Sequence, residues 1–478
     1  MSGFDQDHLL YEELANRIGM LIEKGTYRPG ERIPSVREMS RQQGVSISTV
    51  IHAYYLLEDR GLVEAKPQSG YYVRTILPSA LLEPEISSPE PDPGQVSVQE
   101  LVMRVLRDAN NPSLVQLGAA LPNLELLPTE NLNRLLNSIG RELGKEGGTY
   151  IIPPGVEALR AQIAQRSVRA GCSLAPNDIV ITSGCIEAVD LCLKAVCRPG
   201  DIVAVESPIY FGLLQTLEVH GLKALEIPTH PRDGISVAAL HFAIEHNPIR
   251  ACLVISNFNN PLGSQIPDEN KKELVELLAR HDIPLIEDDI LGELYFTDRR
   301  PIVAKAFDKT GLVMLCSSFS KDLCPGYRIG WVVPGRFEST IQWLKYTASV
   351  SAPTLPQYAI AEFLASGGYD HHLRRARKEY ARNIARISQA VMKYFPSETR
   401  VTRPSGGFVL WVQMPDAVDS LELYSLAIKE GITLTPGYLF SPSKQFRNFI
   451  RINAADWSYK IDHALETLGD IIAELARK

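Results

Sequence analysis

Residues 317–331 read SSFSKDLCPGYRIGW, and the lysine in this stretch decides how the rest of the chain is interpreted. Lys321 follows an apolar run, so we expect it just beyond the end of a buried strand. Its amine can form a Schiff base with an aldehyde, and the hydroxyls of Ser318 and Ser320, together with Arg328, suit a phosphate dianion. Taken alone the string favours an exposed structural lysine, so its interpretation depends on the other motifs of the chain.

Two motifs place polar or aromatic residues where a strand-like run ends. ITSGCIEAVDL, residues 181–191, sets Ser183, Gly184 and Cys185 where a strand turns into a helix, so backbone N–H groups face an anion. Any strand-to-helix turn also favours Ser-Gly. VESPIYFG places Tyr210 beyond another strand end, where its ring either stacks on an aromatic cofactor or belongs to the core.

Three further motifs supply an amide, a carboxylate and a guanidinium. NNPLG offers Asn260 as a donor, or is simply a good turn. PLIEDDILGELYF ends a strand with three acids, and a carboxylate such as Asp288 could keep a cofactor's ring nitrogen protonated. FIRINAA puts Arg451 in an apolar strand, where either a carboxylate ligand or a structural salt bridge would satisfy it.

These motifs, in this order over roughly residues 112–475, resemble fold type I aminotransferases, including the branch related to kynurenine and aminoadipate aminotransferases. The resemblance implies a large domain with a mostly parallel sheet, a small α+β domain, and the cofactor pyridoxal 5'-phosphate (PLP) bound as an aldimine on Lys321. Asp288 would pair with the pyridine nitrogen, Asn260 would bond the phenolic oxygen, and Tyr210 would stack on the ring.

The same resemblance assigns the anionic contacts. Arg451 would hold the α-carboxylate of an amino-acid ligand, and Tyr150, in GGTYIIPPGVEALR, would reach the partner subunit's phosphate, so the site would lie at a dimer interface. The residues implied to hold the phosphate are Ser183, Gly184, Cys185, Ser318, Ser320 and Arg328.

The first 76 residues have a different pattern. A first helix with one apolar stripe is expected to end near Gly25, and a Ser-x-x-Glu capping box at Ser35 opens a short second helix that Gly44 ends. A third helix opens at residues 46–49, and two short strands joined by a tight turn follow as a hairpin. A small structural helical cap is the alternative to a DNA reader.

The stretch RPGERIPSVREMSRQQGVSISTVIHAYYLLEDRGLVEAKPQSGYYV looks like the winged helix-turn-helix of the GntR regulators. That family often has arginine where this chain has Ile47, so a donor that could grip guanine is missing there. The outward residues that the resemblance assigns to DNA are Arg32, Ser35, Arg37, Ser46, Ser48, Thr49, His52 and Gly70.

Composition and charge limit the classes of protein to which this chain can belong. The net charge of −7 argues against wholesale coating of nucleic acid, and residues 1–76 carry nine basic against ten acidic side chains, so DNA contact must be local. Seven cysteines without a Cys-x-x-Cys pair favour reduced thiols and no metal site. With no signal peptide or apolar span of membrane length, we expect a soluble cytoplasmic protein.

A proline-rich stretch opens a predicted linker over residues 77–111, between the reader, 1–76, and the PLP domain, 112–478. Together the parts look like the MocR subfamily of GntR regulators. That implies a domain-swapped homodimer that binds double-stranded DNA and senses a small amine, amino acid or vitamer. Aminotransferases of this fold usually have a tyrosine where this chain has Ile290 or Leu291, so we expect sensing with weak turnover, the alternative being a working aminotransferase.

Overall fold

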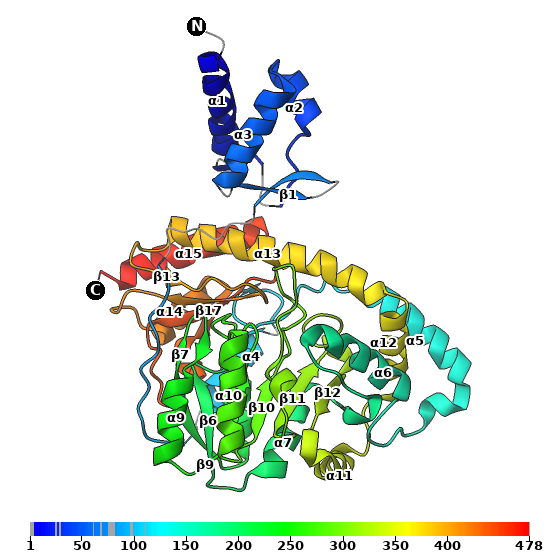
Figure 1. Cartoon of the computed structure of the whole chain (residues 1–478). Helices are drawn as coiled ribbons and strands as arrows, with labels where there is room; N and C mark the ends of the chain where they lie inside the picture. Colours follow the sequence, from blue (N-terminus) through cyan, green and yellow to red (C-terminus); the bar gives the residue numbers. More distant parts are fainter. Residues whose placement is uncertain are drawn as a thin grey trace. The chain divides into compact units, whose positions relative to one another are not determined.

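A computed structural model divides the chain into two compact units, made mainly of residues 1–80 (unit 1) and 81–478 (unit 2) (Figure 1). The turn of the predicted wing at 67–68 and the start of the predicted linker at 77–81 lie outside the described residues. The structure describes residues 4–23, 26–27, 30–60, 62–66, 69–74, 82–95, 99–109 and 111–477.

Unit 1 contains three helices followed by a two-stranded antiparallel sheet, as the sequence predicts for a winged helix-turn-helix. The helices and strands are α1 (Phe4–Glu23), α2 (Val36–Gln43), α3 (Ile47–Asp59), β1 (Val63–Lys66) and β2 (Gly70–Val73).

Local capping explains where the helices of unit 1 begin and end. The predicted capping box is present, because Glu38 N–H donates to Ser35 Oγ at 3.3 Å and Ser35 N–H donates to the Glu38 carboxylate. Gly44 ends α2 in the left-handed region, with φ of 65°. Tyr54, which is fully buried, donates its hydroxyl to the carbonyl of Pro34 at 2.7 Å and so fastens α3 to the loop before α2.

The centre of unit 2 is a mixed sheet that comprises nine strands of the described chain, in the order β3-β7-β6-β9-β10-β11-β12-β5, with β8 paired to β7. Neighbours from β7 to β11 run parallel, whereas β3, β8 and β12 are antiparallel to their partners. The strands are β3 (Gly94–Gln95), β5 (Val180–Thr182), β6 (Ile202–Ser207), β7 (Lys223–His230), β8 (Gly234–Ile235), β9 (Ile249–Ile255), β10 (Leu285–Asp288), β11 (Val313–Ser318) and β12 (Gly330–Val333).

Helices cover both faces of this sheet, and a smaller antiparallel sheet follows it in the chain. On one face α9 and α10 pack apolar side chains against the strands (Figure 1), and on the other α7 lies against β10, β11 and β12. The helices are α4 (Gln99–Ala109), α5 (Thr129–Leu143), α6 (Glu157–Ser167), α7 (Cys185–Val196), α8 (Phe211–Val219), α9 (Val237–His246), α10 (Asp268–Arg280), α11 (Glu338–Ser349), α12 (Thr354–Ala365), α13 (Gly368–Tyr394), α14 (Ser420–Lys429) and α15 (Tyr459–Leu475).

The smaller sheet of unit 2 has the order β13-β14-β17-β16, and a separate pair joins β15 to β4. The predicted fold class, a winged helix-turn-helix followed by a large, mostly parallel sheet and a small α+β part, is confirmed. These strands are β4 (Val115–Gln116), β13 (Arg400–Val401), β14 (Val409–Gln413), β15 (Ile432–Thr433), β16 (Thr435–Pro436) and β17 (Phe449–Asn453).

The segment predicted as a linker is structured over most of its described length. Leu82 forms a β-bridge with Arg400, and Ser87 Oγ accepts a 2.9 Å hydrogen bond from Thr229 N–H. β3 extends the large sheet, and α4 buries Val102 and Val105. Prolines prevent a helix at the start of this segment, but an extended chain can still pair along unit 2.

Membrane spans and metal sites can be judged over the described residues. No helix among them is long and apolar enough to cross a membrane. No group of three or more His, Cys, Asp or Glu side chains in this part of the chain could hold a metal ion. All seven cysteines are buried and free.

We expect Tyr54→Phe to destabilise unit 1 by about 1 kcal/mol, because the partly buried carbonyl of Pro34 would lose its donor. Chemical denaturation followed by a probe in unit 1 measures this change. Tyr55→Phe is the matched control, since the neighbouring Tyr55 side chain is 57% exposed. Equal stability of the Tyr54 and Tyr55 variants would contradict the proposed role of this hydrogen bond.

Candidate functional site

A cavity of about 200 Å³ lies where strands of the large sheet end. Because the carboxyl ends of parallel strands meet at one edge, residues that follow β6, β9, β10 and β11 converge there, as do residues that follow β5. Eight predicted residues share this wall with six apolar residues. The full lining is Ala120, Cys185, Ile186, Tyr210, Ile255, Asn260, Asp288, Ile290, Leu291, Ser318, Ser320, Lys321, Arg328 and Phe408.

Lys321 projects into this cavity three residues after the end of β11. Its Nζ donates to the carbonyl of Ala120 at 2.7 Å. Burial, and then the positive charge of Arg451, lower the pKa of Lys321 to about 8, because both disfavour the protonated amine. An appreciable fraction of the side chain is therefore the free amine near neutral pH.

Asp288 is the last residue of β10 and also lines the cavity. Burial raises the pKa of its carboxyl group to about 6, while the Ile290 N–H, which donates to Oδ1 at 2.9 Å, opposes the rise. Above that pH the carboxylate is charged and lies in a buried site, where a cationic ring nitrogen would be its natural partner.

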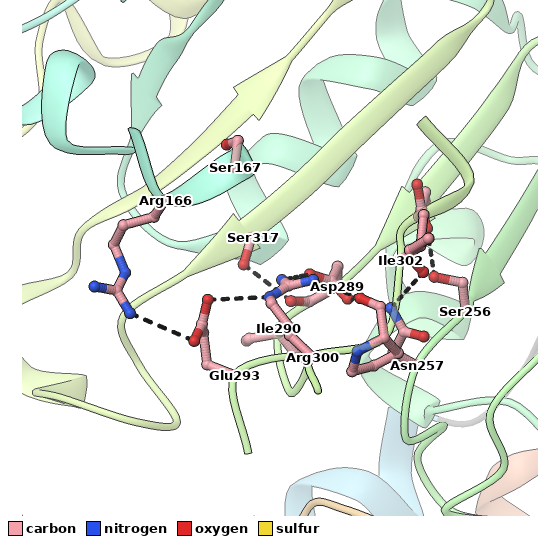
Figure 2. A network of polar contacts seen from close by, with 12 residues as sticks. Arg166, Ser167, Ser256, Asn257, Asp289, Ile290, Glu293, Arg300, Ile302 and Ser317 are labelled. Carbon is pink, nitrogen blue, oxygen red and sulfur yellow. Dashed lines mark hydrogen bonds and ion pairs between the residues drawn. The ribbon is translucent and has the colours of Figure 1, made fainter. Parts of the chain in front are cut away.

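The two acids that flank Asp288 face away from the cavity lining. Glu287 accepts hydrogen bonds from Ser256 Oγ and from the backbone N–H of Ala304. Asp289 accepts from Asn257 Nδ2 at 2.7 Å and pairs with the buried Arg300 (Figure 2). The three consecutive carboxylates thus have three different surroundings, and only Asp288 remains for a ligand.

Glu293 joins the Asp289 pair to two helices. Arg300 Nε donates to its carboxylate at 3.0 Å, and Arg166 of α6 lies 3.5 Å away on the other side (Figure 2). Arg377 of α13 contributes a third ion pair at 3.1 Å. Although burial opposes ionisation, these arginines keep the pKa of Glu293 below its usual range. The network anchors the segment that follows β10.

The proposed phosphate contacts gather around the N-terminus of α7. Gly184 precedes this helix with φ of 98°, and a Cβ there would lie 2.3 Å from Arg328 Nη2. Arg328 donates to the carbonyl of Ser183 at 3.0 Å and to Ser320 Oγ at 3.2 Å. No ion pair joins Arg328 to a carboxylate of the described chain. Glycine is favoured at 184 because side chains rarely tolerate this φ, and a Cβ there would also displace the guanidinium.

One predicted donor of this subsite is already engaged. The backbone N–H of Ser183 donates to the Glu187 carboxylate, which also binds Lys345 at 2.7 Å. This N–H is therefore not free for an added anion, because an acid in the first turn of α7 already accepts its hydrogen bond. Ser183 itself lines an adjoining open pocket that shares Tyr210 and Arg328 with the cavity.

Arg451 lies behind Asn260 and is fully buried. Its Nη1 donates to Asn260 Oδ1 at 2.9 Å, its Nη2 donates to the Gly118 carbonyl at 2.7 Å, and its Nε has no partner. Burial lowers the pKa of Arg451 to about 10. No carboxylate of the described chain pairs with it, so the alternative of a structural salt bridge is not supported.

Tyr150, a predicted site residue, lies outside the cavity of its own chain. Its side chain is 79% exposed and does not line the cavity. The carbonyls of Gly118 and Ala120 and the hydroxyl of Thr435, which bonds Arg451 at 3.3 Å, were not predicted. Backbone carbonyls act here independently of side-chain type, so no motif could have identified the first two.

The residues present fit PLP. Lys321 offers an amine, Asp288 offers a buried carboxylate, and Arg328 offers a guanidinium without an acidic partner beside a helix N-terminus. In place of the usual tyrosine, Ile290 and Leu291 contribute apolar walls.

In unit 1 two distant predicted residues meet. Gly70 has φ of 106°, and a Cβ there would lie 3.1 Å from Arg32 Nε, so the guanidinium of Arg32 lies against the first residue of β2. Arg37, Ser48 and His52 are exposed, as expected for residues that contact DNA.

The prediction that Thr49 points outward toward DNA is wrong, because its side chain is only 5% exposed. Its hydroxyl lies 2.7 Å from Ser46 Oγ, which also accepts the Thr49 N–H. Ser35 and Ser46 are the N-caps of α2 and α3, so their hydroxyls already bind their own helices. Ile47, the predicted departure, is 51% exposed.

Comparisons with known proteins agree with both units. Residues 10–73 match the family of bacterial regulatory proteins, gntR family, and residues 126–468 match aminotransferase class I and II, a PLP-dependent family. The chain is similar to two uncharacterised HTH-type transcriptional regulators of Escherichia coli K12, YdcR and YjiR. The identities are 38% and 40%, over 97% of this chain and 99% and 98% of theirs.

A solved structure resembles unit 2. The α-aminoadipate aminotransferase LysN of Thermus thermophilus, complexed with N-(5'-phosphopyridoxyl)-L-leucine, is 26% identical with a TM-score of 0.73, covering 80% of this chain and 96% of LysN. The chain therefore belongs to the MocR subfamily of GntR-type transcription regulators, in which a winged helix-turn-helix is joined to a PLP-dependent aminotransferase-like domain.

Proposed function

We propose that this regulator senses an α-amino acid or a related small amine through PLP attached to Lys321. The observation that carries the proposal is a pair of arginines, Arg328 in the cavity wall and Arg451 bonded to Asn260 of that wall, which have no carboxylate partner in the described chain. Arg300 of unit 2 is paired with Asp289 and Glu293, whereas the buried Arg160, like Arg328 and Arg451, bonds only carbonyl and amide or hydroxyl oxygens. What distinguishes Arg328 and Arg451 is their place at the cavity, where an anion could bind each of them.

The two anions differ in kind. Arg328, Ser320 and the start of α7 suit a phosphate dianion, which accepts hydrogen bonds on several oxygens. Arg451 lies deeper and has a free Nε, which suits the planar carboxylate of an amino acid. When bound, PLP supplies an aldehyde that primary amines attack and a ring that withdraws electrons.

Each of the remaining residues has a defined part. The Lys321 amine would hold the cofactor covalently through its aldehyde carbon, at the position where an incoming amine would compete. Asp288 would keep the ring nitrogen protonated and Tyr210 would cover the ring, while Asn260 presents its amide beside Arg451. A ligand that displaces Lys321 also gains the contacts of Arg451, and this difference in binding free energy can shift the geometry of the regulator.

Unit 1 is the part of the regulator proposed to bind DNA. Arg32, Arg37, Ser48 and His52 are the proposed contacts to phosphates and base edges. Because residues 1–76 have a net charge of −1, a single reader should bind weakly, and a homodimer that presents two readers would gain from their linkage. Tyr150, exposed on unit 2, is the residue proposed to reach the phosphate of the partner subunit.

A working aminotransferase is the second candidate, because Lys321, Asp288 and Arg451 are all retained. Against efficient catalysis, Ile290 and Leu291 place no hydroxyl in the cavity to tune the basicity of Lys321 for proton transfer. We therefore propose sensing as the function and transamination as a slow side reaction.

Borohydride reduction of the purified, PLP-loaded protein should fix the cofactor to Lys321, and mass spectrometry should find the adduct on the peptide that carries this residue. Lys345→Ala is the control, since Lys345 pairs with Glu187 and does not line the cavity. An adduct at another lysine, or none at all, would overturn the proposed attachment.

Uptake of PLP by the cofactor-free protein should accelerate as the pH rises through about 8, because only the deprotonated amine of Lys321 attacks the aldehyde. Arg451→Gln removes a positive charge that lowers this pKa, so the midpoint of the rate profile should move to higher pH. Arg447→Gln, at a side chain 63% exposed, should leave it in place. A wild-type midpoint at about 10.4, the ordinary value for lysine, would refute the assignment.

A screen of amino acids and amines should find one that changes the cofactor's absorbance rapidly while little keto acid forms. Single-turnover spectroscopy with assay of the keto product measures both. Leu291→Tyr should raise turnover if its hydroxyl reaches the cofactor. Wild-type turnover on the order of one to a thousand per second would instead favour the working aminotransferase.

A further inference from the structure

α13 carries a large local excess of positive charge. Between Gly368 and Tyr394 it has seven arginine and lysine residues against two acids, a net charge of +5, whereas the whole chain has a net charge of −7. Unit 1, which reads DNA, is close to neutral. The charge that duplex DNA requires is therefore found on a helix of unit 2.

The helical period places the exposed charges on one face. His371 is exposed, and so are Arg374, Arg375 and Lys378, which follow it by three, four and seven residues; we call these four residues the α13 basic face. The opposite side of this stretch of the helix is buried in the core of unit 2 through Leu373, Ala376 and Tyr380.

Neither acid of α13 is paired with a residue of the α13 basic face in the ion pairs of the described chain. Asp370 pairs with Arg166 at 3.1 Å and with Arg169 at 2.8 Å, and Glu379 pairs with Arg382 at 3.1 Å. No ion pair joins Arg374 or Arg375 to a carboxylate of the described chain. These two arginines therefore keep their charge for a ligand.

We propose that the α13 basic face binds the sugar-phosphate backbone of duplex DNA that flanks the sequence read by unit 1. From His371 to Lys378 the helix advances about 10.5 Å, which spans about three phosphates of one strand at about 3.4 Å each along the duplex axis. Arginine binds phosphate through two parallel N–H groups, and such contacts do not depend on base sequence.

This proposal rests on the proposed DNA-binding function and supplies what the reader lacks. Residues 1–76 contribute a net charge of −1, so phosphate neutralisation by unit 1 alone gives little affinity. Contacts from α13 would add a sequence-independent component, so that this component of DNA affinity resides in unit 2.

The test compares the full-length protein with the triple variant R374A/R375A/K378A on a linear mixed-sequence duplex fragment. The dissociation constant is measured over a series of salt concentrations. Each phosphate contact contributes about 0.9 to the slope of log K against log salt, so the variant should lower that slope by up to about 2.7 per protomer. At low salt it should bind roughly tenfold more weakly.

Two controls keep the result specific. K272A/R280A/K309A removes three exposed charges elsewhere on unit 2 and should leave the slope unchanged. R374K/R375K retains the charge and should restore most of the slope. Unchanged PLP absorbance shows that the triple variant is folded, and R374Q/R375Q replaces it if it is not, with a proportionally smaller loss of slope.

The outcomes separate the two proposals. An unchanged slope in the α13 variant, while Arg37→Ala in the reader weakens binding, overturns the α13 surface and leaves DNA binding by unit 1 intact. A loss equal to that of K272A/R280A/K309A overturns it as well, because the effect would then follow from net charge alone. Wild-type protein that binds no duplex at any salt concentration overturns both.

Discussion

Positive charge held without an acidic partner is the constraint on which unit 2 depends. Burying a guanidinium costs free energy unless its donors are bonded, and Arg451 is accommodated by an amide oxygen, a hydroxyl and a backbone carbonyl instead of a carboxylate. Arg328, which is exposed, is also held by two carbonyls and the Ser320 hydroxyl. Burial, and then the positive charges of Arg451 and Arg328, lower the pKa of Lys321, and both guanidinium groups can bind anions.

The arrangement is possible because the edge of a parallel sheet gathers distant segments. Asp288 and Ser318 end neighbouring strands, and Lys321 lies three residues after Ser318, yet Lys321 bonds a residue as distant in the chain as Ala120. Behind this edge, the ion pairs of Asp289 and Glu293 tie the segment after β10 to α6 and α13 (Figure 2). A layer of ion pairs thus supports the cavity wall from behind.

The sequence predicted the parts of this structure that depend on periodicity and on side-chain type. Strand ends bearing Tyr210, Asn260 and Asp288 could be placed because polar residues followed apolar runs. The outward position predicted for Thr49 was wrong because its hydroxyl bonds the N-cap residue Ser46 and so turns inward. A shift of one residue in the start of the helix would change which side chain makes this contact. The structure of the segment predicted as a linker depends on pairing with the edge of the large sheet, where β3 joins β7, and no local sequence pattern reveals that pairing.

The distribution of cysteine has a practical consequence for watching this protein move. All seven thiols are buried in unit 2, and burial raises the pKa of Cys172 and Cys197 to about 12, so native protein should resist alkylating reagents. Unit 1 contains no cysteine. A cysteine introduced on β2 of unit 1 would be the accessible thiol, and a fluorophore attached there would report the motion of the DNA reader against a chemically silent background.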